Sequence, residues 1–366
     1  MPGRIVLFGA TGYTGLLTAE AMVARGMSPV LAARNGERLR GLADELGGLE
    51  SMVADVERPE TVRALVGRGD VLVSTVGPFV RWGEPAVQAA IAGGATYLDS
   101  TGETGFIREV FERHGPGAEA AGCALLTAAG YDWIPGNLAA GLALAAAGEE
   151  AVRVDTGYFI VGGAKMSGGT RASAAHALTA PSFAWRDGRL VTERGAKRLR
   201  SFSVRGKDRP AISVGTSEAF AVPRLKSGLR EVNTYLGWFG GLSRPMQSQS
   251  AALSVITRVP GSRAALDKLL GAVVKGSTGG PDEAERAASG SYVTALAYDA
   301  AGRELAEVRL EGVDGYTFTG RFLAWAAEQA ADPGLQGTGA LGPAEAFGLE
   351  RLEQGVAESG ISRSSD

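Results

Sequence analysis

The sequence predicts an α/β protein: a doubly wound parallel sheet that carries an inserted α+β domain with a mostly antiparallel sheet. Up to Thr127, short apolar runs alternate with helical stretches, which is the pattern of parallel strands joined by crossing helices. From Val152 onward, apolar runs are instead separated by polar turns, as in antiparallel sheets. The length of 366 residues suits two domains.

The parallel strands are expected where apolar runs are bounded by turn or charge signals. They are residues 4–8, 29–33, 50–54, 70–75, 96–99 and 121–127. The expected helices are residues 13–25, 36–45, 59–67, 84–92 and 105–113. Gly26 follows the first helix at the position of a left-handed cap. This order predicts a sheet of about six strands.

The second half of the chain begins with an Ala- and Leu-rich helix that runs from Asn137 to about residue 147. A hairpin is expected at residues 291–298 and 304–311, around the turn Asp299-Ala300-Ala301-Gly302. Further helices are expected at residues 262–274, 320–331 and 343–358, the last preceded by the Gly-rich linker 337–342. We therefore expect a nucleotide domain at 1–137, a substrate and dimerisation domain at 138–331, and a returning segment at 332–366.

Composition excludes several classes of protein. Hydrophobic residues make up 45% of the chain, enough for a sizeable core, and a net charge of −3 gives no general attraction to nucleic acid or to anionic membranes. Two histidines and one cysteine are too few for a His or Cys metal cage, so no metal is expected. No apolar stretch reaches the ~18 residues of a transmembrane segment. The lone Cys123 and the lack of an export signal favour a cytoplasmic setting.

A glycine motif follows the first strand directly. The segment GATGYTG, residues 9–15, stands between a strand and a helix with the spacing Gly-x-x-Gly-x-x-Gly. Gly9 allows a tight turn, Gly12 lets a pyrophosphate approach the backbone, and Gly15 lets the helix pack closely on the strand. The first N–H groups of the helix bind the anion. We expect Gly9, Thr11, Gly12, Tyr13, Thr14 and Gly15 to contact a dinucleotide.

The end of the second strand indicates which dinucleotide is bound. An NAD-binding chain places a carboxylate there, whereas this chain has Arg34 and Asn35, with Arg38 one helical turn later. Guanidinium groups pair with a 2'-phosphate, so the sequence favours NADPH. Asp55, after the third strand, has two open interpretations: it meets the adenine, or it caps the next turn.

Two further strand ends carry polar or rigid residues. Val76, Gly77 and Pro78 follow the fourth strand at the edge where ligands bind in such sheets, and we expect them to line the nicotinamide ribose. Residues 99–103 follow the fifth strand. Ser100 and Thr101 in this run are expected to cap the next helix.

The chain resembles the saccharopine dehydrogenase-like family of NADP-binding oxidoreductases, whose bacterial branch includes trans-acting enoyl reductases. The resemblance is carried by GATGYTG, AARN, TVGPF, YLDSTGE, AGYDWIPGN and GPAEAFGLERL, which begin at residues 9, 32, 75, 97, 129 and 342. It implies a Rossmann-like domain completed by the C-terminus around an inserted substrate domain. This chain has Gly136-Asn137 where many relatives carry Ser-Asp, and residues 162–260 show no family signature.

A nicotinamide reductase presents a hydride to one end of a double bond and usually supplies a proton to the other. No tyrosine of this chain has a lysine four residues later, so the short-chain dehydrogenase arrangement is missing. The remaining candidate proton donors are Tyr131, Asp132, His176 and Lys165. His176 also fits an ordinary helix position and Lys165 a glycine-rich loop, and protonation by solvent stays open.

The middle of the chain bears on the substrate. Aromatic residues at 183, 185, 220, 235, 238 and 239 suggest a hydrophobic substrate, or else simply a core. Residues 186–209 hold nine Lys or Arg against three acids, which suggests docking of a phosphopantetheine carrier or coenzyme A, or else a solvated hairpin. With Phe202 as the one stacking residue of this run, nucleic acid is not expected as a partner.

The sequence thus predicts an NADPH-dependent reductase of an activated C=C bond in a lipid- or polyketide-like substrate, acting as a homodimer. Two alternatives remain open at this point. One is an NADPH-dependent imine reductase of the saccharopine type. The other is a non-catalytic NADPH-binding regulatory protein.

Overall fold

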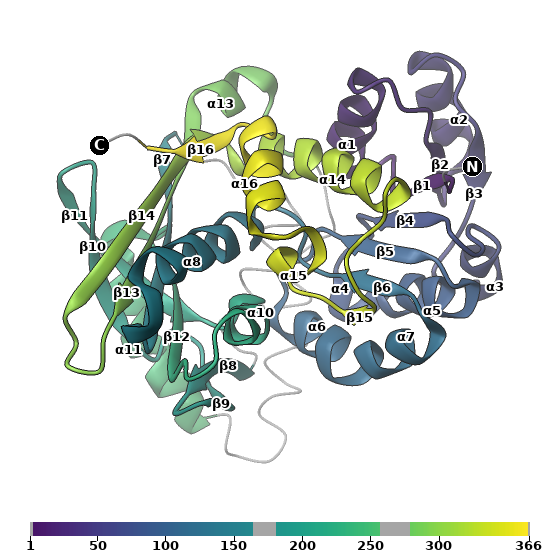
Figure 1. The fold of residues 1–366 in the computed structure, drawn as a ribbon. Helices are drawn as coiled ribbons and strands as arrows, with labels where there is room; N and C mark the ends of the chain where they lie inside the picture. The colour runs from purple at the N-terminus through teal and green to yellow at the C-terminus, as the bar shows by residue number, and fades with distance from the viewer. Residues whose placement is uncertain (1–2, 164–180, 257–278, 365–366) are drawn as a thin grey trace. The chain divides into compact units, whose positions relative to one another are not determined.

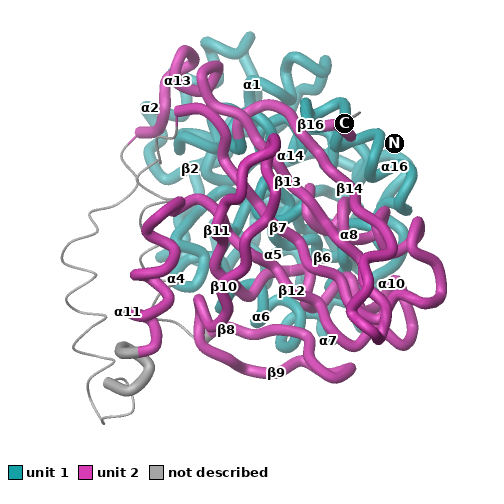
Figure 2. The backbone as a smooth tube through the Cα atoms, turned by 90° about the vertical axis from the view of Figure 1, so that its left-hand side faces the viewer, with its two compact units in different colours: residues 1–134, 315–361 teal, residues 135–314, 362–366 magenta. Residues whose placement is uncertain are grey.

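The computed structural model describes residues 3–163, 181–256 and 279–364. The chain forms two compact units, which are coloured separately in Figure 2. The first consists of Met1–Ile134 and Gly315–Ile361, and the second of Pro135–Asp314 and Ser362–Asp366. The predicted helix 262–274, His176 and Lys165 lie outside the described residues.

The first unit contains a parallel sheet with the strand order β15-β6-β5-β4-β1-β2-β3 (Figure 1). Its strands are β1 (Ile5–Phe8), β2 (Val30–Ala33), β3 (Ser51–Val53), β4 (Val71–Ser74), β5 (Thr96–Asp99), β6 (Ala124–Leu126) and β15 (Gly339–Ala340). The central strands β1, β2 and β4 are buried except at Ile5, as in parallel sheets that are covered on both faces. The six predicted parallel strands are therefore confirmed.

Helices cover both faces of this sheet (Figure 1). One face carries α1 (Tyr13–Ala24), α2 (Gly36–Glu45), α14 (Gly315–Ala331) and α16 (Leu349–Glu358). The other carries α3 (Pro59–Arg63), α5 (Glu84–Gly93), α6 (Thr104–Glu109) and α7 (Gly115–Ala121). The short helices α4 (Phe79–Trp82) and α15 (Pro343–Phe347) complete the unit, and a π-helical turn, Val110–His114, joins α6 to α7.

The strand order reverses at the centre of the sheet, and this reversal locates the site. Strand β1 pairs in parallel with β2 on one side and with β4 on the other. The segments that follow β1, β2, β4, β5 and β6 leave from the same carboxyl edge. Ligands of doubly wound sheets bind at this edge, beside the point where the order reverses.

Two details of the first unit differ from the sequence predictions. The Gly-rich linker 337–342 contains a seventh strand, β15, which pairs in parallel with β6. The helix expected at 343–358 is two helices, because Gly348 between them adopts φ 77° and ψ 151°, outside the helical region.

The boundary between the two compact units differs from the domain boundary expected at residue 331, and helix α14 shows why. The chain returns to the first unit at Gly315. Phe318, Phe322 and Trp325 of α14 are buried in that unit. At Gly320, a Cβ atom would lie 2.9 Å from the carbonyl oxygen of Leu17 in α1, so the two helices are packed backbone to backbone.

The second unit is built on a mixed sheet with the order β10-β11-β12-β7-β13-β14-β16; in addition β8 pairs with β12, and β9 pairs with β8. Its strands are β7 (Arg153–Gly162), β8 (Pro181–Arg186), β9 (Arg189–Arg194), β10 (Leu199–Val204), β11 (Lys207–Val214), β12 (Glu231–Leu236), β13 (Ser289–Tyr298), β14 (Glu304–Val313) and β16 (Ile361–Arg363). Its helices are α8 (Ile134–Ala147), α10 (Glu218–Leu225), α11 (Ser243–Ile256) and α13 (Glu283–Ala287), with 3-10 turns at Gly148–Glu150 and Gly240–Leu242. The predicted hairpin is confirmed as β13 and β14, and the parallel pair of β12 and β7 makes the sheet mixed.

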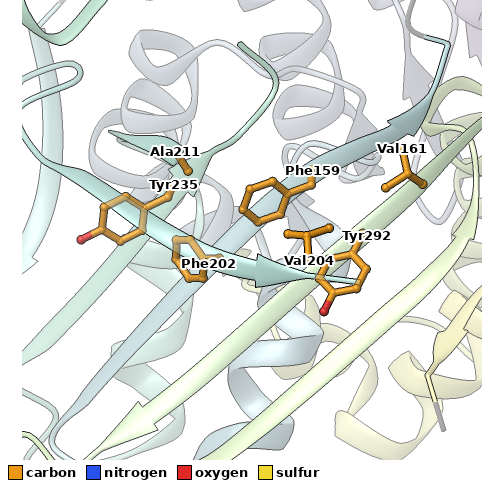
Figure 3. Close-up of a cluster of buried hydrophobic side chains, with 7 residues drawn as sticks. All are labelled: Phe159, Val161, Phe202, Val204, Ala211, Tyr235 and Tyr292. Atoms are coloured by element: carbon orange, nitrogen blue, oxygen red, sulfur yellow. The ribbon is translucent and has the colours of Figure 1, made fainter. Parts of the chain in front are cut away.

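A cluster of buried apolar side chains forms the core of this sheet. Figure 3 shows its members, which come from β7, β10, β11, β12 and β13: Phe159, Val161, Phe202, Val204, Ala211, Tyr235 and Tyr292. The ring centroids of Phe159 and Phe202 lie 5.7 Å apart, and the two rings pack edge to face. These rings therefore stabilise the unit from within.

Among the residues that the structure describes, no helix is long and apolar enough to cross a membrane.

Candidate functional site

The glycine loop after β1 is held against the sheet by its own backbone. The N–H of Gly9 donates to the carbonyl oxygen of Ala32 at 2.8 Å. Gly9 has φ 93°, which favours glycine, and a Cβ there would lie 2.7 Å from Oγ1 of Thr75. At Gly15, a Cβ would lie 2.1 Å from the carbonyl oxygen of Gly9. The first turn of α1 therefore packs directly on the loop, as the motif predicts.

The start of α1 leaves room for an anion. Its N-cap is Gly12, which is exposed, has extended backbone and has no side chain with which to cap the helix. The first turn of α1 holds no acidic residue. Thr11 and Thr14 are half-buried beside it, and the ring of Tyr13 packs edge to face on Tyr316 at 5.3 Å. Because the first N–H groups of a helix have no partner within it and lie at its positive end, this turn fits a pyrophosphate.

The end of β2 presents cations to the same edge of the sheet. Arg34 and Arg38 are exposed. Asn35 serves as the N-cap of α2, where its Oδ1 accepts from the N–H of Arg38 at 3.0 Å, so its side chain has a structural role. The one acidic residue in the first turn of α2 is Glu37, which is also exposed. These residues fit a 2'-phosphate better than a ribose 2'-hydroxyl.

Replacing Arg34 by Ala is expected to raise the Kd of NADPH by ~10- to 100-fold, since a hydrogen bond to a charged group contributes ~1.5–3 kcal/mol. The Kd of NADH should rise by less than about threefold. Titration calorimetry with both coenzymes measures this. Arg40→Ala is the matched control, because it removes an equally exposed cation from α2. Equal losses for NADPH and NADH would show that Arg34 does not recognise the 2'-phosphate.

Asp55 shapes the turn that follows β3. Its Oδ1 accepts from the N–H of Glu57 at 3.1 Å, and its own N–H donates to Oγ1 of Thr61 at 2.9 Å. The structure therefore gives Asp55 the turn-capping role that was one of its two interpretations. Its contact with an adenine stays a prediction.

The corner after β4 is capped from a distant part of the chain. Val76 is half-buried, Gly77 and Pro78 are exposed, and α4 begins directly after them. The buried carboxylate of Glu103 accepts from the N–H of Phe79 at 2.9 Å and from the N–H of Val80 at 3.0 Å. Sequence reasoning missed this role, since it expected Ser100 and Thr101 to cap the next helix. That expectation is wrong: the N-cap of α6 is Glu103, and no described side chain caps this helix.

Asp99 is a second residue whose role sequence reasoning missed. Its side chain is fully buried at the end of β5, where it accepts from the N–H of Thr101 at 2.8 Å, from Oγ1 of Thr127 at 2.8 Å and from the N–H of Ala128 at 3.0 Å. Burial raises the pKa of this carboxyl to about 6, although the hydrogen bonds from Ala128, Thr101 and Thr127 oppose the shift. Asp99 thereby joins the segments that follow β5 and β6.

Asp132, beyond the end of β6, is the candidate proton donor that the structure favours. Its Oδ1 is shielded from solvent and has no hydrogen-bond partner among the described residues. Burial raises the pKa of this carboxyl to about 7. The ring of Tyr131, by contrast, packs on Phe318 at 6.4 Å, and a Cβ on Gly315 would lie 2.8 Å from that ring. A carboxyl that is half protonated near neutral pH is suited to general acid catalysis.

The raised pKa values of Asp132 and Asp99 predict how stability depends on pH. The folded state holds these protons more tightly than the unfolded chain, whose carboxyls titrate at an ordinary pKa of 3.8. Their contribution to stability is present below that pH and is lost as pH rises through about 6 and about 7. Asp132→Asn should therefore become more stable, relative to wild type, as pH rises from about 5 to about 8. Denaturant unfolding at both pH values measures it; an unchanged difference would contradict the raised pKa of Asp132.

Most cations of the basic run, residues 186–209, have ion-pair or hydrogen-bond partners within the second unit. Glu193 is surrounded by Arg186, Lys197 and Arg198. Arg200 pairs with Asp155 and Arg205 with Glu311, while Arg194 and Arg209 donate to backbone carbonyl groups. The exposed cations Arg189 and Lys207 have no such side-chain partner within the described ranges. The run thus presents much less unpaired charge than the sequence suggested.

Several of the aromatic residues considered for a substrate wall belong to the core. Tyr235 is a member of the buried cluster of Figure 3. Phe183 is buried and packs on Phe220 at 4.9 Å, and Nε1 of Trp185 donates to the carbonyl oxygen of Leu229 at 2.9 Å. These residues therefore give no independent sign of a hydrophobic substrate.

The first unit is thus a Rossmann-type dinucleotide-binding unit. A glycine loop, an uncapped helix start and exposed arginines stand at the carboxyl edge of a parallel sheet, beside Asp132, whose Oδ1 is shielded from solvent.

Comparison with known proteins shows what the first part of the chain is similar to. Residues 5–125 match the family model described as the saccharopine dehydrogenase NADP binding domain. This part of the chain therefore resembles the NADP-binding domain of saccharopine dehydrogenases. The chain is 38% identical to a trans-acting enoyl reductase of Mycobacterium ulcerans over 141 residues. This match covers 37% of this chain and 34% of the relative. Over 140 residues the chain is 40% identical to the enoyl reductase of Mycobacterium leprae, with the same shares covered. The chain spans about a third of the length of these relatives.

Solved structures show a similar fold over nearly the whole chain. Saccharopine dehydrogenase (L-Glu forming) of Saccharomyces cerevisiae has a TM-score of 0.62 at 13% identity, and the match covers 99% of both chains. Homospermidine synthase of Legionella pneumophila, solved in complex with NAD, has a TM-score of 0.63 at 9% identity, over 100% of this chain and 92% of that one. At these identities the comparison establishes the fold.

Proposed function

We propose that the protein is an NADPH-dependent reductase of an activated C=C bond. The observation that carries this proposal is the protonatable carboxyl of Asp132, whose Oδ1 is shielded from solvent, at the same sheet edge as the dinucleotide loop. Bound NADPH supplies a hydride. The amides at the start of α1 would hold the pyrophosphate and the guanidinium of Arg34 the 2'-phosphate, and Asp132 donates the proton that the other end of the double bond requires.

The relatives named trans-acting enoyl reductases support the choice of a C=C bond. Such a bond accepts hydride when it is conjugated to a thioester carbonyl, so the substrate class is an enoyl thioester with an apolar chain. Imine reduction is the competing activity, and NADPH binding without turnover is the competing non-enzymatic role.

One assay separates reduction of a C=C bond, reduction of an imine and NADPH binding without turnover. Oxidation of NADPH is followed with enoyl thioesters and with cyclic imines. We expect turnover of enoyl thioesters and at most slow turnover of imines. Faster turnover of imines would replace the proposal with imine reduction, and oxidation by neither substrate would favour the non-catalytic role.

Docking of a carrier or of coenzyme A belongs to the same proposal and has its own test. The exposed Arg189 and Lys207 are the described cations of the basic run that would steer such an anionic partner. Turnover of carrier-bound and free thioesters is compared at rising salt. A steeper salt dependence for the carrier-bound substrate is expected, and identical dependences would remove carrier docking.

A further inference from the structure

A chain of buried hydrogen bonds links three neighbouring strand ends at the carboxyl edge of the first unit. It begins at Asp99, whose carboxylate holds the N–H groups of Thr101 and Ala128 and the hydroxyl of Thr127. The carbonyl oxygen of Asp99 also accepts from the N–H of Ala129 at 2.7 Å. The segments that leave β5 and β6 are thereby fixed to one another.

The chain of hydrogen bonds continues to the end of β4. Oγ1 of Thr101 accepts from the N–H of Glu103 at 3.0 Å, and the Glu103 carboxylate accepts from the N–H groups of Phe79 and Val80. We call Asp99, Thr101 and Glu103 the edge relay. All three side chains are buried.

The edge relay supplies a helix cap that the Gly77-Pro78 corner itself lacks. Helix α4 has four residues, and its N-cap is Pro78, which supplies no side-chain acceptor. Glu103 takes the place of a capping residue. At Gly102, within the relay loop, a Cβ would lie 2.8 Å from Oδ2 of Asp132, so the loop leaves room for that carboxyl. The same loop therefore contacts both the corner and the candidate acid.

We infer that Glu103 is a positioning residue for the nicotinamide half of the dinucleotide. Its carboxylate holds the residues that follow the Gly77-Pro78 corner, and the loop that carries it also lies against Asp132. The inference rests on the proposed function, because it assumes that the nicotinamide half lies along this corner. The adenosine half and the 2'-phosphate would lie at the ends of β2 and β3. Their binding should therefore not depend on Glu103.

The test compares a whole coenzyme with half of it. In Glu103→Gln the amide keeps the size of the side chain but replaces one acceptor oxygen by an NH2 group that faces a backbone N–H. We expect the Kd of NADPH to rise about tenfold, as for loss of a hydrogen bond to a charged group. The Kd of adenosine 2',5'-bisphosphate, which lacks the nicotinamide half, should change by less than about twofold.

Two further variants keep the test decisive. Glu345→Gln is the matched control, since Glu345 caps α15 of the same unit by accepting from the N–H of Gly342 at 2.7 Å, and it should leave both Kd values unchanged. If Glu103→Gln does not fold, Thr101→Val breaks the relay at its middle with little change of shape. Thr101→Val should raise the Kd of NADPH about threefold and leave the Kd of adenosine 2',5'-bisphosphate nearly unchanged.

The outcomes are distinct. Equal loss of NADPH and of the bisphosphate would mean that Glu103 only stabilises the unit, and no loss of either would likewise overturn the inference. A wild-type protein that binds neither ligand would instead refute the proposed function, and the positioning role with it.

Discussion

Gly15→Ala is expected to abolish NADPH binding. Its Cβ would lie 2.1 Å from the carbonyl oxygen of Gly9 and 2.9 Å from Cα of Ala10, and both are backbone atoms that cannot rotate away. Either the loop moves or α1 moves, and the amides of the helix start then no longer converge on the pyrophosphate. We expect the Kd to rise by about 100-fold or more and the unfolding free energy to fall by ~1–3 kcal/mol. Calorimetric titration and denaturant unfolding measure these two quantities.

Gly117→Ala is the matched control for this substitution. Gly117 lies in α7 of the same unit, is exposed, and has open space where a Cβ would stand. It should leave the Kd unchanged and raise stability by ~0.5–1 kcal/mol. If Gly15→Ala bound NADPH as well as this control does, the glycine loop would not be the pyrophosphate site.

Asp132→Asn is expected to lower kcat by ~10²–10⁴-fold with little effect on NADPH binding, because it removes an acid that is protonated near neutral pH. In the wild type, kcat should fall as pH rises through about 7, where the carboxyl loses its proton. In the variant this fall should be absent. Steady-state kinetics across the pH range, with an enoyl thioester, measures both effects.

Tyr131→Phe separates the two donors that follow β6. The substitution keeps the ring that packs on Phe318 and removes only the hydroxyl. If its loss of kcat matched that of Asp132→Asn, the proton would come from Tyr131. A pH profile of Asp132→Asn with the wild-type fall near neutrality would exclude Asp132 as the donor.

The parts of the fold that sequence could predict are those set by local patterns. Strands β1 to β6 are apolar runs that end in turn signals, and the glycine loop is recognisable because its strand and helix lie on either side of it. Strand β15 has two residues, too few to show a pattern, and it forms because β6 offers an unpaired edge. The place of α14 depends on Gly320 meeting Leu17, a contact between distant segments that no local pattern reveals.

The same limit applies to the site. Glu103 caps a helix that begins 24 residues earlier in the chain, and Arg205 is neutralised by Glu311, 106 residues later. Sequence alone therefore did not reveal the capping role of Glu103, and it overstated the unpaired charge that Arg205 contributes. The signal that was present for Asp99 and Glu103 is their position just after a parallel strand, where polar side chains reach the ligand edge. The cytoplasmic setting and the homodimer stay predictions.

The most direct test of the central claim is a calorimetric titration of the wild-type protein with NADPH and with NADH. The account predicts saturable binding of NADPH and binding of NADH that is weaker by about tenfold or more, the contribution of guanidinium groups to the 2'-phosphate. Binding of neither coenzyme, or tighter binding of NADH, would contradict it.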